Sequence, residues 1–365
     1  MKRILVGLSF ASLLGCAHLV EQKFDVVIPP PPEAPRYRLE HVYSSSAEYE
    51  KHGFLDALFG GQSATEQHQL FKPMDVVSNG KGLVYVSDTA KPPRIEVFDE
   101  VKKEVRSFGV EGQGHLLLPL GMGLDAEGNV FVADGKLRQV IEFTPDGKFV
   151  AAYGGAANLE TPSDAAVDSQ RHLLYVTDSK GHRVQVFSLP DGKLLRTIGE
   201  RGSDPGKFNY PSSVAVGKDG KVYVVDALNF RYQVFDAEGK FLVVRGAIGQ
   251  EPGSFARPKG IALDSEGHVY VSDAAFCNVQ VFDQEGKLLL WIGAPGSQPG
   301  EFQLTEGIFI DAADRVFVVD QMNKRVQRFA YLRDQPAKDV GARPAEVGGV
   351  APKVGEDTQP PAAAH

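Results

Sequence analysis

The chain has 365 residues, enough to bury a sizeable core in one large domain or two ordinary ones. Its 42% hydrophobic content excludes general disorder, and its two cysteines exclude a disulfide scaffold or a cysteine-rich zinc module. The formal charge of −8, with no basic face evident in the sequence, argues against a nucleic-acid partner. Abundant Gly and Pro, together with Val, Phe and Tyr, predict short strands and tight turns.

The N-terminal residues have the pattern of a secretory signal. Lys2 and Arg3 precede an apolar stretch that is too short to span a bilayer as a mature helix. The stretch ends in Leu13-Leu14-Gly15-Cys16, which resembles the lipobox of bacterial lipoproteins. The resemblance implies removal of residues 1–15 and stable membrane anchoring through several acyl chains on Cys16. Ala17, rather than Asp, follows the cysteine, which by resemblance to enterobacterial lipoproteins implies the outer membrane of the cell envelope. A plain cleaved signal or a chance cysteine is the alternative.

The segments on either side of the main domain differ from it in composition. Residues 16–36 contain the run Pro29-Pro30-Pro31-Pro32, which favours an extended polyproline II tether. A proline-rich ligand for a partner protein is the alternative reading of this run. Residues 333–365 are rich in Pro, Ala and Gly and show neither strand nor helix periodicity, which predicts a disordered tail.

A repeated motif occupies residues 37–332. An aromatic-Val-x-Asp signature recurs at intervals of 44 to 48 residues, and its copies end at Asp88, Asp134, Asp178, Asp226, Asp273 and Asp320. A Phe follows each of these aspartates nine or ten residues later, and Asp-Gly or Glu-Gly turns come next in units two to five. We interpret the aspartates as structural residues that end a strand and cap the next turn, rather than as a catalytic set.

Each unit contains four short runs of alternating residues. In unit five they are 260–264, 268–273, 278–283 and 287–292, separated by Gly-containing turns. Four antiparallel strands per unit, none able to bury both of its faces alone, predict the blades of an all-β propeller. The units resemble NHL repeats, and the chain resembles the six-bladed NHL propeller lipoproteins of bacteria. Gln139 and Asn278 depart from the pattern, because most other units have Arg there.

Strand counting predicts how the ring closes. The last unit contains runs at 307–311, 315–320 and 325–332 but lacks a fourth strand. Residues 37–43 alternate as a strand ahead of the first full unit, so we expect them to complete the last blade and remove its open edge. Residues 44–72 would form an enlarged connection.

The starts of the innermost strands predict a candidate binding site. In a propeller these starts meet at one end of the axis, and we expect Asp75, Asp164, Ser212, Lys259 and Glu306 to line the mouth of a central channel. Convergent polar groups in a concave mouth indicate binding, and a solvated funnel without a specific ligand is the alternative.

Loop aromatics lie on the same face as this mouth. Phe230 and Phe276 follow the second strands of neighbouring units, and exposed neighbouring aromatics are typical protein-contact anchors. The alternative is that both tuck between blades. We expect Phe208, Phe255 and Phe302 to pack between blades, Trp291 to pack on an outer strand, and Cys277 to be a buried free thiol.

These features predict an envelope-anchored, monomeric module that binds a protein or peptide through its loop face, without cofactor or catalytic residues. The alternative is a metal-dependent propeller enzyme, similar to calcium-dependent lactonases or peptide-amidating lyases. No inner-strand start is a His, which leaves a three-His zinc site unsupported. Asp75, Asp164 and Glu306 are oxygen donors suited to calcium, but no Asn stands at a matching start.

Overall fold

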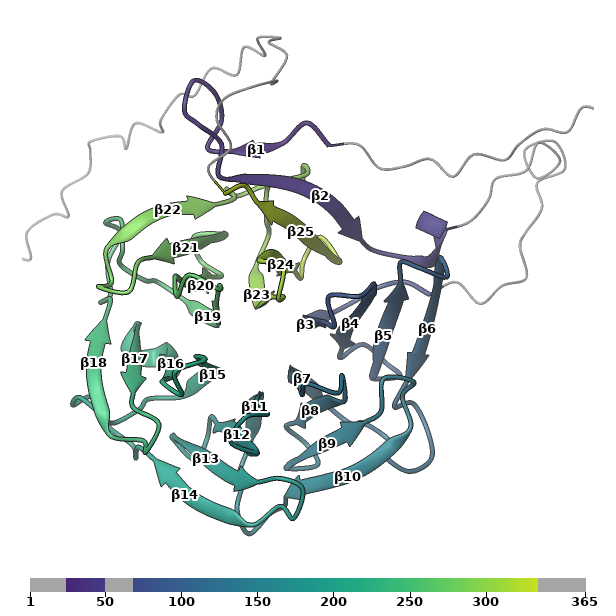
Figure 1. Cartoon of the computed structure of the whole chain (residues 1–365), viewed down its shortest axis with the longest axis vertical. Helices are drawn as coiled ribbons and strands as arrows, with labels where there is room; N and C mark the ends of the chain where they lie inside the picture. The colour runs from purple at the N-terminus through teal and green to yellow at the C-terminus, as the bar shows by residue number, and fades with distance from the viewer. Residues whose placement is uncertain (1–23, 50–67, 334–365) are drawn as a thin grey trace, which may run out of the picture. The chain divides into compact units, whose positions relative to one another are not determined.

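The computed structural model describes residues 24–49 and 68–333. These residues form six antiparallel sheets arranged as blades around a central axis (Figure 1). This is the all-β, six-bladed propeller predicted from the repeats. Among the described residues the helical elements are two short 3-10 turns, η1 (Ser46–Tyr49) and η2 (Ala227–Asn229). No helix in these ranges is long and apolar enough for a membrane span.

Blades 1 to 5 each contain four strands that follow one another from the axis outwards. Blade 1 contains β3 (Pro73–Ser78), β4 (Leu83–Asp88), β5 (Arg94–Asp99) and β6 (Glu104–Phe108). Blade 2 contains β7 (Pro119–Leu124), β8 (Val130–Asp134), β9 (Gln139–Phe143) and β10 (Phe149–Gly154). Blade 3 contains β11 (Pro162–Asp168), β12 (Leu173–Asp178), β13 (Arg183–Ser188) and β14 (Leu194–Ile198).

Blades 4 and 5 repeat the same order. Blade 4 contains β15 (Pro211–Val216), β16 (Val222–Asp226), β17 (Arg231–Phe235) and β18 (Phe241–Arg245). Blade 5 contains β19 (Pro258–Leu263), β20 (Val269–Asp273), β21 (Asn278–Phe282) and β22 (Leu288–Ile292). In blade 5 the inner strand begins at Pro258, two residues before the predicted start at Gly260. A register shift between Pro258 and Ile261 interrupts the pairing there and hides the strand start from the alternation pattern.

Blade 6 closes the ring with a strand from the other end of the chain. It contains β23 (Thr305–Ile310), β24 (Arg315–Asp320) and β25 (Arg325–Tyr331), and β2 (Tyr37–Tyr43) pairs antiparallel with β25 as predicted (Figure 1). A short strand, β1 (Val27–Ile28), pairs with β2 and adds a fifth strand. The last part of the predicted tether therefore lies against blade 6. The predicted signal (1–15), Cys16 and most of the tail (334–365) lie outside the described residues.

The core consists of apolar clusters between neighbouring blades. The Phe that follows each repeat aspartate is almost fully buried, with no more than 2% of its surface exposed at Phe98, Phe143, Phe187, Phe235, Phe282 and Phe329. Phe208, Phe255 and Phe302 are fully buried, as predicted. Each lies in the connection from the preceding blade and forms an isolated β-bridge with an earlier residue of the same connection. The blades therefore stack through aromatic contacts that leave the axis open.

The repeat aspartates have the structural role predicted for them. Asp88 accepts hydrogen bonds from the main-chain N–H groups of Phe71, Lys72 and Ala90, at 2.7 to 3.0 Å. Asp134 does the same for four main-chain N–H groups of blade 2. Asp88 and Asp134 thereby tie the loop after their strand to the segment that leads into the innermost strand. This arrangement fixes the loops that surround the axis.

Candidate functional site

The innermost strands begin at one end of the axis and surround a cavity there. We call this end of the propeller the upper face and the cavity the channel mouth. Two consecutive residues from each blade line a volume of about 150 Å³. They are Met74, Asp75, Leu120, Gly121, Ser163, Asp164, Ser212, Ser213, Lys259, Gly260, Glu306 and Gly307. The five polar residues predicted for the mouth are all among them. The carboxyl groups of Asp75 and Asp164 are buried rather than exposed at the surface.

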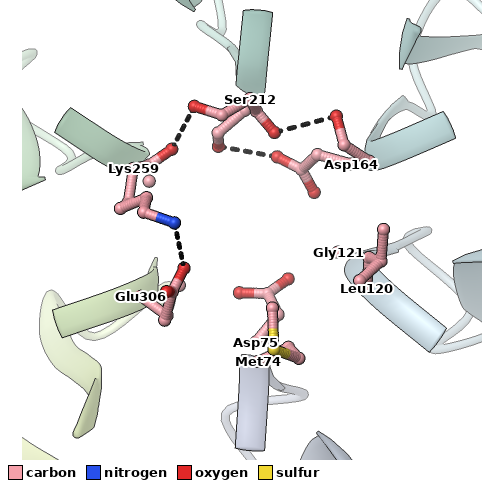
Figure 2. Close-up of a pocket in the computed structure, with 12 residues that line it drawn as sticks. Met74, Asp75, Leu120, Gly121, Asp164, Ser212, Lys259 and Glu306 are labelled. Carbon is pink, nitrogen blue, oxygen red and sulfur yellow. Dashed lines mark hydrogen bonds and ion pairs between the residues drawn. The ribbon is translucent and has the colours of Figure 1, made fainter. Parts of the chain in front are cut away.

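The first residue of each pair forms an outer ring. Lys259 Nζ lies 3.0 Å from Glu306 Oε2, and Ser212 Oγ donates a 2.7 Å hydrogen bond to the Lys259 carbonyl (Figure 2). Ser163 Oγ donates to the Ser212 carbonyl at 3.1 Å. One side of the outer ring is therefore a connected polar arc across blades 3 to 6. Met74 and Leu120 form the apolar remainder of the ring.

The second residue of each pair forms an inner ring, into which two carboxyl groups project. Asp75 and Asp164 are 9% and 8% exposed, and their carboxyl groups point into the hollow in Figure 2. Asp75 Oδ2 accepts a 2.7 Å hydrogen bond from the Met122 N–H. Asp164 accepts hydrogen bonds from Ser213 Oγ at 2.7 Å and from two main-chain N–H groups. Both carboxyl groups are thus held in fixed positions by neighbouring blades.

Burial makes both carboxyl groups weaker acids than usual. Burial, followed by repulsion from Asp164, raises the pKa of Asp75 well above its ordinary value. Burial also raises the pKa of Asp164 to about 6, although hydrogen bonds from Ser213 and the main chain act in the opposite direction. Both carboxyl groups therefore take up a proton more readily than an exposed aspartate does.

These residues do not form a recognisable metal centre. A hard cation such as calcium takes six to eight oxygen ligands, whereas Glu306 is paired with Lys259 and both aspartates accept main-chain hydrogen bonds. Within residues 24–49 and 68–333 there is no group of three or more His, Cys, Asp or Glu side chains placed to hold a metal. We therefore derive no metal chemistry from the channel mouth.

Below the inner ring most of the side chains that line the channel are apolar. A second cavity of about 180 Å³ is lined by later residues of the innermost strands, among them Val76, Met122, Val214, Ile261 and Ile308. Asp75, Asp164 and Ser213 line both cavities. The polar side chains of the channel are therefore concentrated at the upper face.

The predicted aromatic anchors differ from the expectation. Phe230 and Phe276 are half-buried rather than exposed, and Phe230 packs against the cluster shared by blades 4 and 5. Phe230 caps η2 with a left-handed backbone (φ 55°), which turns its ring back toward the core. Cys277 is also half-buried rather than buried. Trp291 is 52% exposed on β22, because alternate residues of this outer strand point away from the blade stack.

Other apolar side chains on the upper face are exposed instead. They are Phe71, Tyr210, Leu228 and Met322, with exposed fractions of 42% to 64%. Lys324 Nζ lies 5.7 Å and Arg94 Cζ 5.9 Å from the centre of the Phe71 ring, so two cations flank this aromatic side chain. The sequence pattern missed these residues, because they stand in loops where no alternation of polar and apolar residues indicates which side chain is exposed.

The upper face also gathers basic side chains that sequence composition did not reveal. Six exposed cations stand on its loops, at least one in every blade except blade 4: Lys72, Lys91, Lys136, Lys180, Arg257 and Lys324. None of the six forms an ion pair with a described residue. The connections between blades at this face also carry exposed carboxylates, at Glu111, Glu160, Glu200, Asp204 and Glu251. We call the set of six cations the basic rim.

Comparisons with known proteins agree with this architecture. The six-bladed β-propeller family matches residues 264–333, and the NHL repeat family matches residues 159–187 and 208–235. The chain is 26% identical over 249 residues to NHL repeat-containing protein 3 of Mus musculus, covering 61% of this chain and 63% of that protein. It is 30% identical over 159 residues to the peptidyl-glycine alpha-amidating monooxygenase of Mus musculus, covering 40% and 16%. The chain thus spans less than two thirds of the length of these relatives.

Solved structures share the fold at low sequence identity. A protein of unknown function from Bacteroides thetaiotaomicron has a TM-score of 0.59 and 14% identity, covering 74% of this chain and 71% of that one. A gluconolactonase from Xanthomonas campestris has a TM-score of 0.56 and 18% identity, covering 72% and 87%. At such identities the likeness extends to the fold alone. The repeats, the blades and these matches together identify the chain as a six-bladed β-propeller that contains NHL repeats.

Proposed function

We propose that this propeller is a binding module that holds an acidic protein or peptide segment across its upper face. The observation that carries the proposal is the basic rim: six exposed cations, on loops around the channel mouth, that form no ion pair with a described residue. The chain as a whole has a formal charge of −8, so this concentration of positive charge runs against its overall balance. A patch of one sign attracts and orients a partner of the opposite sign.

Exposed apolar side chains next to the rim supply contact area for such a partner. Phe71 and Met322 stand on adjoining loops of blades 1 and 6, where Gln321 Nε2 donates a 3.2 Å hydrogen bond to the Pro73 carbonyl. Tyr210 and Leu228 stand together in blade 4, where the Leu228 N–H bonds to the Asn209 carbonyl. Aromatic and apolar anchors beside charged groups are the usual composition of protein contact sites.

The location of the module is part of the same proposal. The lipobox-like Leu13-Leu14-Gly15-Cys16 supports lipid anchoring of Cys16 at the cell envelope, with the outer membrane as the expected site. In that setting the partner is a protein of the envelope. Replacing Cys16 with Ser is expected to shift the protein from the membrane to the soluble fraction of the expressing bacterium. Retention of C16S in the membrane pellet contradicts the anchor.

The binding function is tested with a peptide probe of defined charge. A fluorescent peptide of alternating Glu and Leu is titrated with the wild-type propeller and with Lys72→Glu/Lys91→Glu/Lys324→Glu, which reverses half of the rim. A matched control, Lys148→Glu/Lys240→Glu/Lys287→Glu, makes the same charge change at exposed turns of the opposite face. We expect the rim variant to lose at least about tenfold in affinity and the control variant to change by less than about twofold.

Three outcomes contradict the proposal. The first is no saturable binding of the acidic peptide by the wild type. The second is an equal loss in the rim and control variants, which indicates a general charge effect. The third is tighter binding of single-stranded RNA or of anionic vesicles of comparable charge, which assigns the rim to another class of partner.

A further inference from the structure

A cavity between blades 2 and 3 has no counterpart in the function proposed above. It encloses about 240 Å³ and lies near the turn that joins β7 to β8, at the opposite end of the innermost strands from the channel mouth. Blade 2 contributes Asp125, Glu127, Glu142 and Tyr153, and blade 3 contributes His172 among others. At about 30 Å³ per water molecule it has room for several waters or for one small organic group.

Glu142 breaks the repeat at this place. It pairs with Phe131 across β8 and β9. At the equivalent pairing four other blades have valine, and these residues are Val97, Val186, Val234 and Val281. Blade 6 has Arg328 there, which is paired with Glu100 and Glu40. Glu142 is therefore the only carboxylate at this position, and the blade fold does not require it.

The carboxylate of Glu142 is buried without a cation. Its exposed fraction is 7%, and it forms no ion pair with a described residue. Glu142 Oε2 accepts a 2.6 Å hydrogen bond from Tyr153 Oη, and burial raises the pKa of Tyr153, which keeps that donor protonated. Glu142 Oε1 accepts no hydrogen bond from a described residue, and this atom is accessible to solvent. Because Glu142 lines the cavity, we infer that Oε1 faces it. A buried charge left unpaired costs stability, which suggests a use for this oxygen.

The walls around Glu142 are aromatic and apolar. The rings of Phe131 and Tyr153 stack with centroids 5.9 Å apart at an interplanar angle of 29°. Val167 and Leu189 of blade 3 line the opposite side. Asp125 and the exposed Glu127 add two more carboxylates to the lining. Aromatic faces beside a carboxylate are the surroundings that an organic cation prefers.

The corresponding gap between blades 4 and 5 has the opposite character. It encloses about 120 Å³, is lined by Lys221 and Arg245, and has Val234 at the position of Glu142. The acidic lining is therefore a property of these residues and not of gaps between blades in general. An inorganic metal ion fits the acidic cavity poorly, since the described residues hold no cluster of three metal-ligating side chains.

We propose that the cavity between blades 2 and 3 binds an alkylammonium group, such as a primary amine ligand or the lysine side chain of a peptide. The ammonium nitrogen donates a hydrogen bond to Glu142 Oε1, and the alkyl chain lies against Phe131, Tyr153 and Leu189. The site is independent of the upper face, because it lies at the other end of the blades.

The proposal is tested with n-butylammonium as the probe and n-butanol as its uncharged counterpart. Titration of the full chain is followed by calorimetry or by protein NMR shifts. We expect saturable binding of n-butylammonium and none of n-butanol. Glu142→Gln keeps the shape and the acceptor for Tyr153 but removes the charge, and we expect it to lower the affinity at least about tenfold.

Two further variants separate binding from folding. Glu142→Val restores the residue of the other blades, and we expect it to abolish binding while raising the melting temperature of the ligand-free protein. Glu238→Gln removes an exposed carboxylate from a turn of blade 4, and we expect it to change neither property. No saturable binding by the wild type, or wild-type affinity in the stably folded E142V protein, overturns the proposal.

Discussion

Asp75 lies directly against Gly307 of the neighbouring blade at the channel mouth. A Cβ atom on Gly307 would stand 2.7 Å from the Asp75 Cα and closer still to Asp75 Oδ1. Asp164 stands in the same relation to Gly121, with 2.6 Å between the Asp164 Cα and a Cβ on that glycine. Neither glycine has a left-handed backbone, so the space next to the aspartate, and not the turn geometry, requires glycine there.

Gly307→Ala is expected to destabilise the propeller. The added methyl group must push β3 and β23 apart, and overpacking of this kind costs about 1–3 kcal/mol of unfolding free energy. Urea unfolding measures the cost. The same substitution in an Asp75→Ala background is the control, because removing the carboxyl group relieves part of the contact. Equal costs in the two backgrounds would show that the two residues are not coupled.

The stability of the protein is expected to depend on pH through Asp164. Burial raises its pKa to about 6 from the ordinary value of 3.8, so the folded state binds a proton more tightly than the unfolded state. Protonated Asp164 therefore stabilises the folded state. This stabilisation is fully present below the unfolded pKa of 3.8 and is lost as pH rises through about 6. At about 1.4 kcal/mol per pKa unit the loss approaches about 3 kcal/mol.

Asp164→Asn is expected to flatten this profile and to raise the melting temperature at neutral pH, because it removes a buried charge. Thermal unfolding from acid to neutral pH compares the variant with the wild type and with Asp146→Asn, an exposed turn residue. A wild-type slope in the D164N protein would mean that other groups set the pH dependence.

Closure of the ring by β2 is expected to dominate stability. Tyr43 is fully buried, contacts Phe98 at a ring distance of 5.4 Å and donates a 2.9 Å hydrogen bond to Glu100. Tyr43→Ala should lower the free energy of unfolding by about 3–5 kcal/mol, because a large cavity opens where β2 meets β25. Trp291→Ala is the comparison, and its cost should stay within about 0.5 kcal/mol, because half of that side chain is exposed. Similar costs would contradict closure as the decisive contact.

Binding of the acidic peptide is expected to weaken with salt, and the apolar anchors are expected to contribute independently of salt. Raising the ionic strength from about 0.01 M to about 1 M shortens the screening length from about 30 Å to about 3 Å, which suppresses attraction by the basic rim. Leu228→Ser/Met322→Ser should lower affinity by a similar factor at both salt concentrations. A loss of affinity in this variant that vanishes at high salt would indicate that these side chains act only through the charges around them.

The architecture is readable from the amino-acid sequence, because six copies of one repeat at nearly constant spacing encode the same local structure six times. Alternation identified the strands, the Asp and Phe positions identified the blade edges, and the missing fourth strand predicted the role of residues 37–43. The sequence also placed Asp75, Asp164, Ser212, Lys259 and Glu306 at one mouth, since blade geometry maps each inner-strand start to the axis. Which side chains pair, which are buried and which face solvent becomes visible only in the folded ring. Lys259 pairs with Glu306, Phe230 packs inward, the cations of separate loops form one basic rim, and Glu142 lines a cavity. Some of these relations join residues that are about one blade or more apart in the chain, and others depend on the direction of a side chain within a turn. Local alternation and repeat spacing encode neither kind of relation.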